Sequence, residues 1–210
     1  ADFDFAVQTV KDRLGADAIP IQIPIGSESE FSGIIDIIEE KAFLYQGEDA
    51  TEHVESEIPE EYLEKVSLYR QALIEKTADF DEDLMLNFLE DREISVKSIK
   101  SALRKGVLKL EIFPVLVGSA LKHKGIHPLL DAVLDYLPSP LDIPPVKGVD
   151  PKDEETILER KPSEDQPLSA LAFKVVTDQH VGRLVYLRVY SGKLEPGSNV
   201  INTTNRNRER

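Results

Sequence analysis

The sequence predicts an α/β fold class with an inserted α+β part, followed by antiparallel β structure, and three features support this. The uncharged run Phe113–Val117 passes directly into Gly118–Ser119–Ala120, as expected of a strand buried in a parallel sheet. Residues 126–137 then carry the clearest helical periodicity in the chain. Beyond a proline-rich stretch, residues 141–165, the hydrophobic period changes from that of a helix to that of a strand.

The N-terminal part predicts a helix followed by strands. Apolar side chains fall at helical spacing in residues 3–14, and Gly15 is a typical helix stop. Residues 19–25 read as a strand interrupted by two prolines. Residues 31–38 and 41–45 are both rich in β-forming side chains, so we expect a hairpin with Glu39–Glu40 between its strands.

Helices follow in the middle of the chain. Pro59 opens the first, because a proline at a helix start loses no hydrogen bond. Two more are expected at residues 81–90 and 95–105, with Gly106 as the stop. The helix at 126–137 ends at Pro138, and its apolar positions are Ile126, Leu129, Leu130, Val133, Leu134 and Leu137.

The C-terminal part predicts antiparallel strands. Apolar residues alternate with others at Leu171, Phe173 and Val175, and again at Val185, Leu187 and Val189. Turn signals follow at Ser191–Gly192 and Pro196–Gly197. About three strands fit into residues 166–210, fewer than a closed barrel needs, so we expect only the start of a barrel.

Composition limits the kind of partner. The net charge of -14 and a pI near 4.8 argue against nucleic-acid binding over the whole surface. Residues 160–210 are locally basic, with nine Lys and Arg against five Asp and Glu. The chain has no cysteine, which excludes disulfides and favours a reducing, cytoplasmic setting. No apolar run is long enough to cross a bilayer, so we expect no membrane association.

A small-residue turn after the predicted buried strand is the first of four signatures. Gly118–Ser119–Ala120–Leu121–Lys122 resembles the last of the guanine-recognition motifs of GTPases. The resemblance implies that the Ala120 N–H approaches the O6 of guanine, that Ser119 braces the turn, and that Leu121 or the Lys122 stem packs on the base. On its own this turn is also compatible with an ordinary strand-to-helix loop.

Three further signatures occur in a consistent order. Phe31–Ser32–Gly33–Ile34–Ile35–Asp36 and Tyr136–Leu137–Pro138–Ser139–Pro140–Leu141–Asp142–Ile143–Pro144–Pro145 are similar to segments of elongation factor G. Val181–Gly182–Arg183–Leu184, with Arg188–Leu194 and Gly197 beyond it, is similar to the start of the β-barrel second domain of translational GTPases. Together the four signatures resemble elongation factor G over nearly all of the chain.

The resemblance implies a domain layout. Residues 1–24 and 112–140 would be the distal part of a P-loop GTPase domain, and residues 25–111 its inserted subdomain. Residues 141–165 would be a linker, and residues 166–210 the truncated start of β-barrel domain two. The chain opens on a helix without an initiating Met, so we interpret it as an internal fragment of a longer protein.

The resemblance also implies an activity for the parent protein. Elongation factor G binds GTP or GDP with magnesium and hydrolyses GTP on the ribosome to move tRNA and mRNA. The phosphate-binding glycine loop, the magnesium and switch regions and the Asn-Lys-x-Asp motif lie upstream in that family, and none occurs here. We therefore expect no catalytic residue in this chain, no tight nucleotide binding and no hydrolysis by the fragment alone; Ser119, Ala120 and Leu121 are the candidate base-binding residues.

Two charged regions are candidate partner surfaces. Residues 55–91 hold twelve Asp and Glu against three Lys and Arg. A solvated helical face explains this, but the family's inserted subdomain meets the ribosomal stalk protein, which makes candidate contacts of Glu60, Glu61, Glu64, Glu75 and Glu82. The family's second domain meets small-subunit RNA, for which the candidates are Arg183, Arg188 and Lys193; solubility explains them equally well.

The same sequence also allows other functional interpretations. The four histidines, His53, His123, His127 and His180, have no metal-ligand spacing, so we predict no metal site. A ribosome-protection or recycling GTPase would share the same domains. A non-enzymatic acidic protein-binding module would make the insertion the whole function. We expect a monomer in each case.

Overall fold

The computed structural model describes residues 2–47, 52–150 and 153–210 of the chain. Its residues form two compact units, residues 1–137 (unit 1) and residues 138–210 (unit 2). Among the described residues, no helix is both long enough and apolar enough to cross a membrane.

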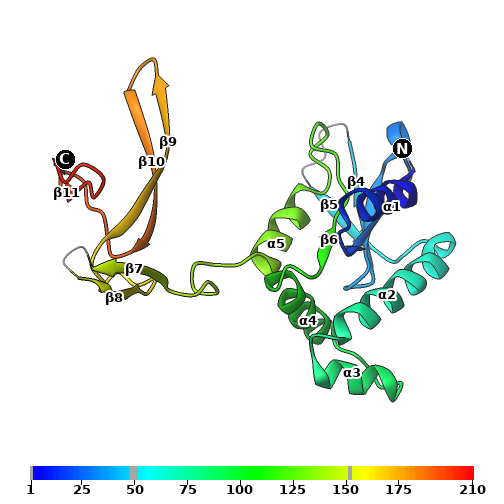
Figure 1. Ribbon diagram of the computed structural model, residues 1–210. Helices are drawn as coiled ribbons and strands as arrows, with labels where there is room; N and C mark the ends of the chain where they lie inside the picture. The colour runs from blue at the N-terminus through cyan, green and yellow to red at the C-terminus, as the bar shows by residue number, and fades with distance from the viewer. Residues whose placement is uncertain (1, 48–51, 151–152) are drawn as a thin grey trace. The chain divides into compact units, whose positions relative to one another are not determined.

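Unit 1 is a mixed α/β structure. Its helices are α1 (Phe3–Leu14), α2 (Leu63–Ala78), α3 (Glu82–Leu89), α4 (Val96–Leu108) and α5 (Ile126–Tyr136), with single 3₁₀ turns at Glu28–Glu30 and Glu60–Tyr62. Its strands are β1 (Ala18–Pro20), β2 (Gln22–Ile25), β3 (Gly33–Asp36), β4 (Lys41–Tyr45), β5 (His53–Ser56) and β6 (Phe113–Val115). The contacts place α2, α3 and α4 together, as Figure 1 shows.

Two sheets organise unit 1. The parallel pair β1–β6 joins residues that are far apart in sequence, with Ile19 opposite Pro114. The other sheet is antiparallel in the order β2–β3–β4–β5, and Ile23 lies opposite Ile35. The predicted hairpin is confirmed as β3–β4, with Asp36 opposite Lys41. The strand β5 lies in a polar, acidic segment whose residues carry no strand signal.

The hydrophobic core of unit 1 is rich in isoleucine. Ile23, Ile34 and Ile35 of the sheet are 0% exposed, as are Leu73 and Leu103 of the helices. Side chains of this size, fully removed from water, each contribute about 1.5–3 kcal/mol of transfer free energy. The β2–β5 sheet and helices α2–α4 therefore hold one another in place.

Arg70 links the β3–β4 turn to helix α2. Its guanidinium donates to the carbonyl oxygens of Ile37 and Ile38 at 2.8 and 2.7 Å. The Asp36 carboxylate closes the same turn by accepting the Ile38 and Glu39 N–H groups, both at 2.8 Å. The turn that the sequence placed at Glu39–Glu40 is thus fixed by side chains on both sides.

Gly106 does not end its helix, which corrects the sequence prediction. Helix α4 continues to Leu108, with Gly106 inside it. A Cβ at this position would lie 2.8 Å from Ile112 Cδ1 and 3.1 Å from Phe80 Cε2. The glycine therefore marks a close packing contact rather than a stop, a role that sequence spacing does not distinguish from a helix C-terminus.

The strand and helix that frame the predicted base loop form as expected, but their burial differs. β6 pairs in parallel as predicted, yet Phe113 is 43% exposed and the rest of the strand only partly buried, because β1 is its one partner among the described strands. Helix α5 covers the predicted residues, but its apolar stripe faces outward: Leu129 is 43%, Leu130 55% and Leu134 78% exposed. A stripe of this spacing usually packs on a core.

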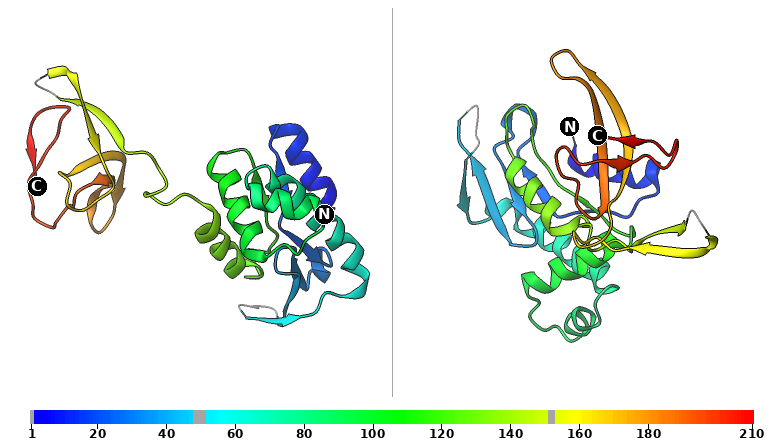
Figure 2. Two further views of the ribbon diagram at one scale, coloured as in Figure 1. Left: turned by 90° about the horizontal axis from the view of Figure 1, so that it is seen from below. Right: turned by 90° about the vertical axis from the view of Figure 1, so that its left-hand side faces the viewer.

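Unit 2 consists of antiparallel pairs. Its strands are β7 (Val146–Asp150), β8 (Asp153–Arg160), β9 (Ser169–Asp178), β10 (Gly182–Ser191), β11 (Val200–Ile201) and β12 (Arg208–Glu209), which pair as β7–β8, β9–β10 and β11–β12. The β9–β10 pair forms a long ribbon (Figure 2). The β7–β8 hairpin lies inside residues 141–165, which we expected to form a linker between domains. Pro144 and Pro145 precede β7 and Pro162 follows β8, whereas Pro151 lies outside the described residues.

Candidate functional site

The predicted base-binding residues lie in a short closed loop between β6 and α5. Ser119 N–H donates to the Lys124 carbonyl at 2.9 Å, and Lys124 N–H returns a bond to the Ser119 carbonyl at 3.1 Å. His123 N–H donates to the Ala120 carbonyl at 3.3 Å inside this closure. The paired bonds hold residues 120–123 as a protruding turn.

Two glycines allow the base of this loop to close. Gly125 adopts φ +80°, and a Cβ there would lie 2.6 Å from the Val117 carbonyl oxygen. A Cβ on Gly118 would lie 2.8 Å from the Lys124 carbonyl oxygen. Any larger residue would force the two ends of the loop apart, so the small side chains at the loop base follow from its geometry.

The three candidate residues occupy different positions in the loop. Ser119 is engaged through its backbone in the closure. Ala120 is exposed, and its N–H has no hydrogen-bond acceptor among the described residues. The Leu121 side chain is 88% exposed. The N–H groups of Leu121 and Lys122 likewise have no acceptor among the described residues. The loop therefore presents unpaired backbone donors, that of Ala120 among them, next to an apolar side chain, and a planar base needs both features at its edge and face.

Lys124 connects this loop to the second sequence signature. The residue is 7% exposed, and its ammonium donates to the Phe31 carbonyl at 2.7 Å. It also lies 5.8 Å from the centre of the Phe31 ring. The burial of Lys124 does not follow from the sequence, because a lysine in a loop is ordinarily exposed. The structure thus brings together two segments that were recognised separately.

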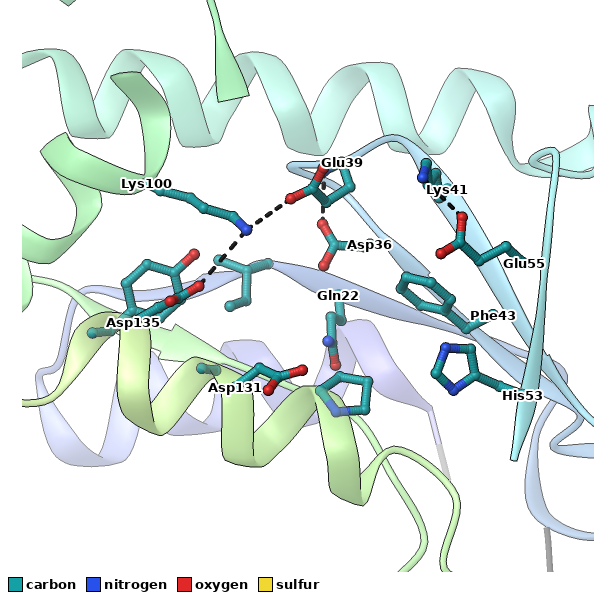
Figure 3. A pocket seen from close by; sticks show the side chains of 14 residues that line it. Gln22, Asp36, Glu39, Lys41, Phe43, His53, Glu55, Lys100, Asp131 and Asp135 are labelled. Atoms are coloured by element: carbon teal, nitrogen blue, oxygen red, sulfur yellow. Dashed lines mark hydrogen bonds and ion pairs between the residues drawn. The ribbon is translucent and has the colours of Figure 1, made fainter. Parts of the chain in front are cut away.

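A second candidate site is a cavity of about 310 Å³ between α5 and strands β2–β5, shown in Figure 3. Strands β2–β5 form one wall, α5 the opposite wall, and Lys100 of α4 one end. The α5 residues that line it, Pro128, Asp131, Ala132 and Asp135, share one helix face. Helix α5 therefore turns acidic side chains toward the β2–β5 sheet and leaves its leucines exposed.

Ion pairs surround the cavity without neutralising it. Lys41 binds Glu55 at 2.8 Å across β4 and β5. Lys100 binds Glu39 at 2.7 Å and lies 3.7 Å from Asp135. Burial raises the pKa of the Asp36 carboxyl, against the stabilising N–H bonds from the turn. Burial also raises the pKa of the Tyr136 hydroxyl at the edge of the cavity.

Sequence reasoning missed this cavity, although two signals were present. Gln22 interrupts an otherwise apolar strand, and Asp131 and Asp135 stand four residues apart on a helix. Each signal is common on protein surfaces, and only the fold shows that they face one another. Among the described residues, no group of three or more His, Asp or Glu is placed to hold a metal ion.

The predicted acidic contacts are all exposed. Glu60 and Glu61 lie in the 3₁₀ turn before α2, Glu64 and Glu75 in α2, and Glu82 in the first turn of α3. None of the five forms a side-chain hydrogen bond or salt bridge with the described residues. Glu64 and Glu75 share a face of α2 with Leu68, which is 63% exposed. This face combines negative charge with an exposed apolar side chain.

The predicted basic residues of unit 2 are exposed but not alike. Arg183 and Arg188 lie in β10, and Arg188 stacks on Tyr190 with its guanidinium 5.4 Å from the ring centre. Lys193 follows the strand and lies 3.5 Å from the Glu195 carboxylate. Among the described residues, Arg188 and Lys193 therefore each have an internal partner, and Arg183 has none.

Comparisons with known proteins support the fold. No model of a protein family matches the chain. A crystal structure of a protein from Thermus thermophilus matches with a TM-score of 0.71 and 29% sequence identity, over 95% of this chain. The match covers 27% of the Thermus protein, so the chain spans a minor part of that protein's length. The likeness supports an α/β part followed by a β-rich part.

Proposed function

We propose that this chain is an internal part of a translational GTPase resembling elongation factor G, whose parent protein hydrolyses GTP on the ribosome to drive tRNA and mRNA movement in the cytoplasm. The observation that carries the proposal is the closed loop 118–125 after a parallel strand, with the Ala120 N–H free of any internal acceptor among the described residues. The likeness to the Thermus protein supports the same order of α/β and β-rich parts.

The residues present fit one portion of a guanine nucleotide. A base edge needs a donor such as the Ala120 N–H, and the exposed Leu121 side chain offers an apolar surface to the base face. Residues that would hold the phosphates and magnesium do not occur in the sequence. A few hydrogen bonds of about 0.5–1.5 kcal/mol each do not offset an association cost of roughly 4–15 kcal/mol. The chain alone should bind GTP or GDP weakly and should not hydrolyse GTP.

The proposed domain layout follows from the same resemblance. Residues 1–24 and 112–140 belong to the GTPase domain, residues 25–111 to its insertion, residues 141–165 to a linker and residues 166–210 to domain two. The outward-facing leucines of α5 support this assignment, since a helix of a GTPase domain packs its apolar stripe on that domain's sheet.

The proposed partners are those of a ribosomal factor. The acidic face of α2 with Leu68 suits a basic, partly apolar docking site on the stalk protein. Exposed ion pairs contribute only about 0.2–1 kcal/mol each, so such docking would be transient and sensitive to salt. Arg183 and its neighbours on β10 suit contacts to RNA phosphates without base readout.

Two other functions would use the same residues differently. A ribosome-protection or recycling GTPase would share the loop and the domain order. An acidic protein-binding module without nucleotide chemistry would need only the face of α2. Stalk binding without any response of residues 119–121 to guanine nucleotides favours the module over the GTPase fragment.

The proposal is tested by titrating the chain with fluorescent GDP and, separately, with purified ribosomal stalk protein at low and high salt. We expect weak GDP binding, and stalk binding that falls as salt rises. The variant Glu64→Lys should weaken stalk binding, whereas the control Glu111→Lys, an equal charge change outside the α2 face, should not. Tight GDP binding, or stalk binding that is insensitive to salt and to Glu64→Lys, would contradict the account.

A further inference from the structure

The cavity between α5 and the β2–β5 sheet is independent of the nucleotide loop and has no role in the proposed function. We propose that this cavity binds primary ammonium groups on an aliphatic chain, as carried by a free polyamine or by the lysine side chains of a partner segment. Its volume of about 310 Å³ is at the lower end of the range of small-ligand sites.

The charge of the cavity favours a cation. Five carboxylates line it, against two lysines. The lysines are already committed to Glu55 and Glu39, at 2.8 and 2.7 Å. Asp131 forms no ion pair or hydrogen bond with the described residues, and Asp135 has only the more distant Lys100 ammonium, at 3.7 Å. The acidic face of α5 therefore retains negative charge that a bound cation would offset.

Gln22 supplies an observation of a different kind. Its side chain is 2% exposed and points from β2 into the cavity (Figure 3). Its Oε1 accepts a long bond of 3.4 Å from the Val117 N–H, whereas its Nε2 has no acceptor among the described residues. The Nε2 group is not among the fully buried unpaired atoms, so it keeps access to the cavity, where a ligand or water can bind it. The unpaired part of this amide faces the cavity, so its NMR signals should change when a molecule binds there.

Asp36 lies beside Gln22 in the sheet. The two residues are directly opposite each other in the β2–β3 register. The Asp36 Oδ1 accepts both turn N–H groups, and no bond to Oδ2 from a described residue is present. A carboxylate that is largely removed from water and keeps one oxygen free is stabilised by a nearby cation more than an exposed one is.

Aromatic and aliphatic surface completes the site and favours an organic cation. Phe43 and His53 line the end away from Lys100, with ring centres 4.7 Å apart in an edge-to-face arrangement. The Nδ1 atom of His53 is buried and has no hydrogen-bond partner among the described residues. An ammonium group near the Phe43 ring gains a cation–π contact. Pro128 and Ala132 of α5 offer apolar contacts to a methylene chain.

The test is an amide NMR titration of the full 210-residue chain with spermidine. We expect the Gln22 side-chain NH₂ signals and the backbone amides of Asp131 and Asp135 to shift together and to saturate. A short peptide, acetyl-Lys-Lys-amide, forms the second arm and distinguishes a protein-borne lysine from a free polyamine by which of the two binds more tightly. Magnesium chloride alone at equal ionic strength forms the third arm.

Variants separate a specific site from general charge attraction. Asp131→Asn should weaken spermidine binding about three- to fivefold, and Asp131→Lys should abolish it, because the new ammonium competes for the same acids. The control Glu93→Gln removes the same charge from an exposed loop outside the cavity and should leave binding unchanged.

Two results would overturn the proposal. One is the absence of any Gln22 response to either amine. The other is an equal response to magnesium alone, or equal weakening by Glu93→Gln, which would identify a diffuse ionic effect. Asp131 is exposed and forms no hydrogen bond or ion pair with the described residues, so its variants should fold, and unchanged backbone spectra without ligand verify this.

Discussion

In unit 1 the isoleucines of β2 and β3 are withdrawn from water, whereas in unit 2 the apolar residues of β9 and β10 remain about half exposed. Ile23 and Ile35 are 0% exposed, while Phe173 is 61%, Val175 58% and Val185 49% exposed. Among the described residues of unit 2, only Ser191 is buried. Its hydroxyl donates a hydrogen bond to the Pro167 carbonyl. Strands with a similar share of apolar residues therefore contribute different amounts to the free energy of unfolding.

The difference arises from what each strand can pack against. The sheet of unit 1 is covered by helices α2–α4, which are amphipathic and follow it in the chain. Unit 2 contains no helix among its described residues, and its strands are joined in pairs. A two-stranded ribbon without a covering layer is at best marginally stable in water. The exposed face of β9–β10 and the leucines of α5 are thus the surfaces where additional packing would contribute most.

The largest expected effect comes from comparing an alanine substitution in the core of unit 1 with one on the ribbon of unit 2. Leu103→Ala, in the core of unit 1, should lower the free energy of unfolding by about 2–5 kcal/mol. Phe173→Ala, on the exposed ribbon, should change it by less than about 0.5 kcal/mol. Urea unfolding followed by far-ultraviolet circular dichroism measures both, and similar losses for the two variants would remove the distinction between the units.

The next largest effect on stability is expected from replacing Gly106 inside helix α4. Gly106→Ala should destabilise unit 1 by about 1–3 kcal/mol, although alanine is the better helix former, because its Cβ would overlap Ile112. Ser101→Ala on an exposed position of the same helix should gain about 0.5 kcal/mol or less. A stabilising Gly106→Ala, measured by the same urea unfolding, would show that the packing contact is not tight.

Lys124 provides a smaller effect that is local to the loop. Lys124→Met should remove the bond to the Phe31 carbonyl and cost about 1–2 kcal/mol, while its apolar stem keeps most of the packing. Amide hydrogen exchange should accelerate at residues 119 and 124 more than in α2. Uniform exchange rates in the variant and the parent chain would mean that the loop closes without this bond.

The smallest effect is a pH dependence at the start of α3. The hydrogen bond from Lys105 and the Leu84 N–H lower the pKa of Asp81 below its unfolded value. A carboxyl group with a depressed folded-state pKa stabilises the fold above the unfolded pKa of about 3.9, and this contribution disappears as pH falls through the folded value. Stability measured from pH 6 to roughly pH 3 should therefore fall less steeply for Asp81→Asn than for the parent chain; equal slopes would argue against the bond.

Most of the helices and the loop at residues 118–125 could be predicted from the sequence. The predictions that were wrong have physical causes. Spacing identified α1, α5 and the β3–β4 hairpin, because periodicity and caps such as Gly15 are local properties. It could not tell which way α5 faces, since the same stripe serves any apolar neighbour. Gly106 was misassigned because its reason is a contact with Ile112, a residue beyond the helix.

The candidate sites show the same limit. Ser119, Ala120 and Leu121 were found from a local motif, and the structure places them in one loop. Gln22, Lys100 and Asp131 were not found, because they come from three elements that only the fold brings together. Lys124 was not predicted for the same reason, because its burial depends on the Phe31 carbonyl, which lies far away in sequence.

The most direct test of the proposed function is an amide NMR comparison of GDP and ADP, each added at millimolar concentration to the intact chain. The two nucleotides share their phosphates and ribose and differ in the base. The account predicts that the amide signals of Ala120 and Leu121 shift with GDP and remain in place with ADP. Equal shifts with both nucleotides, or no shift with either, would contradict the assignment of this loop to guanine recognition.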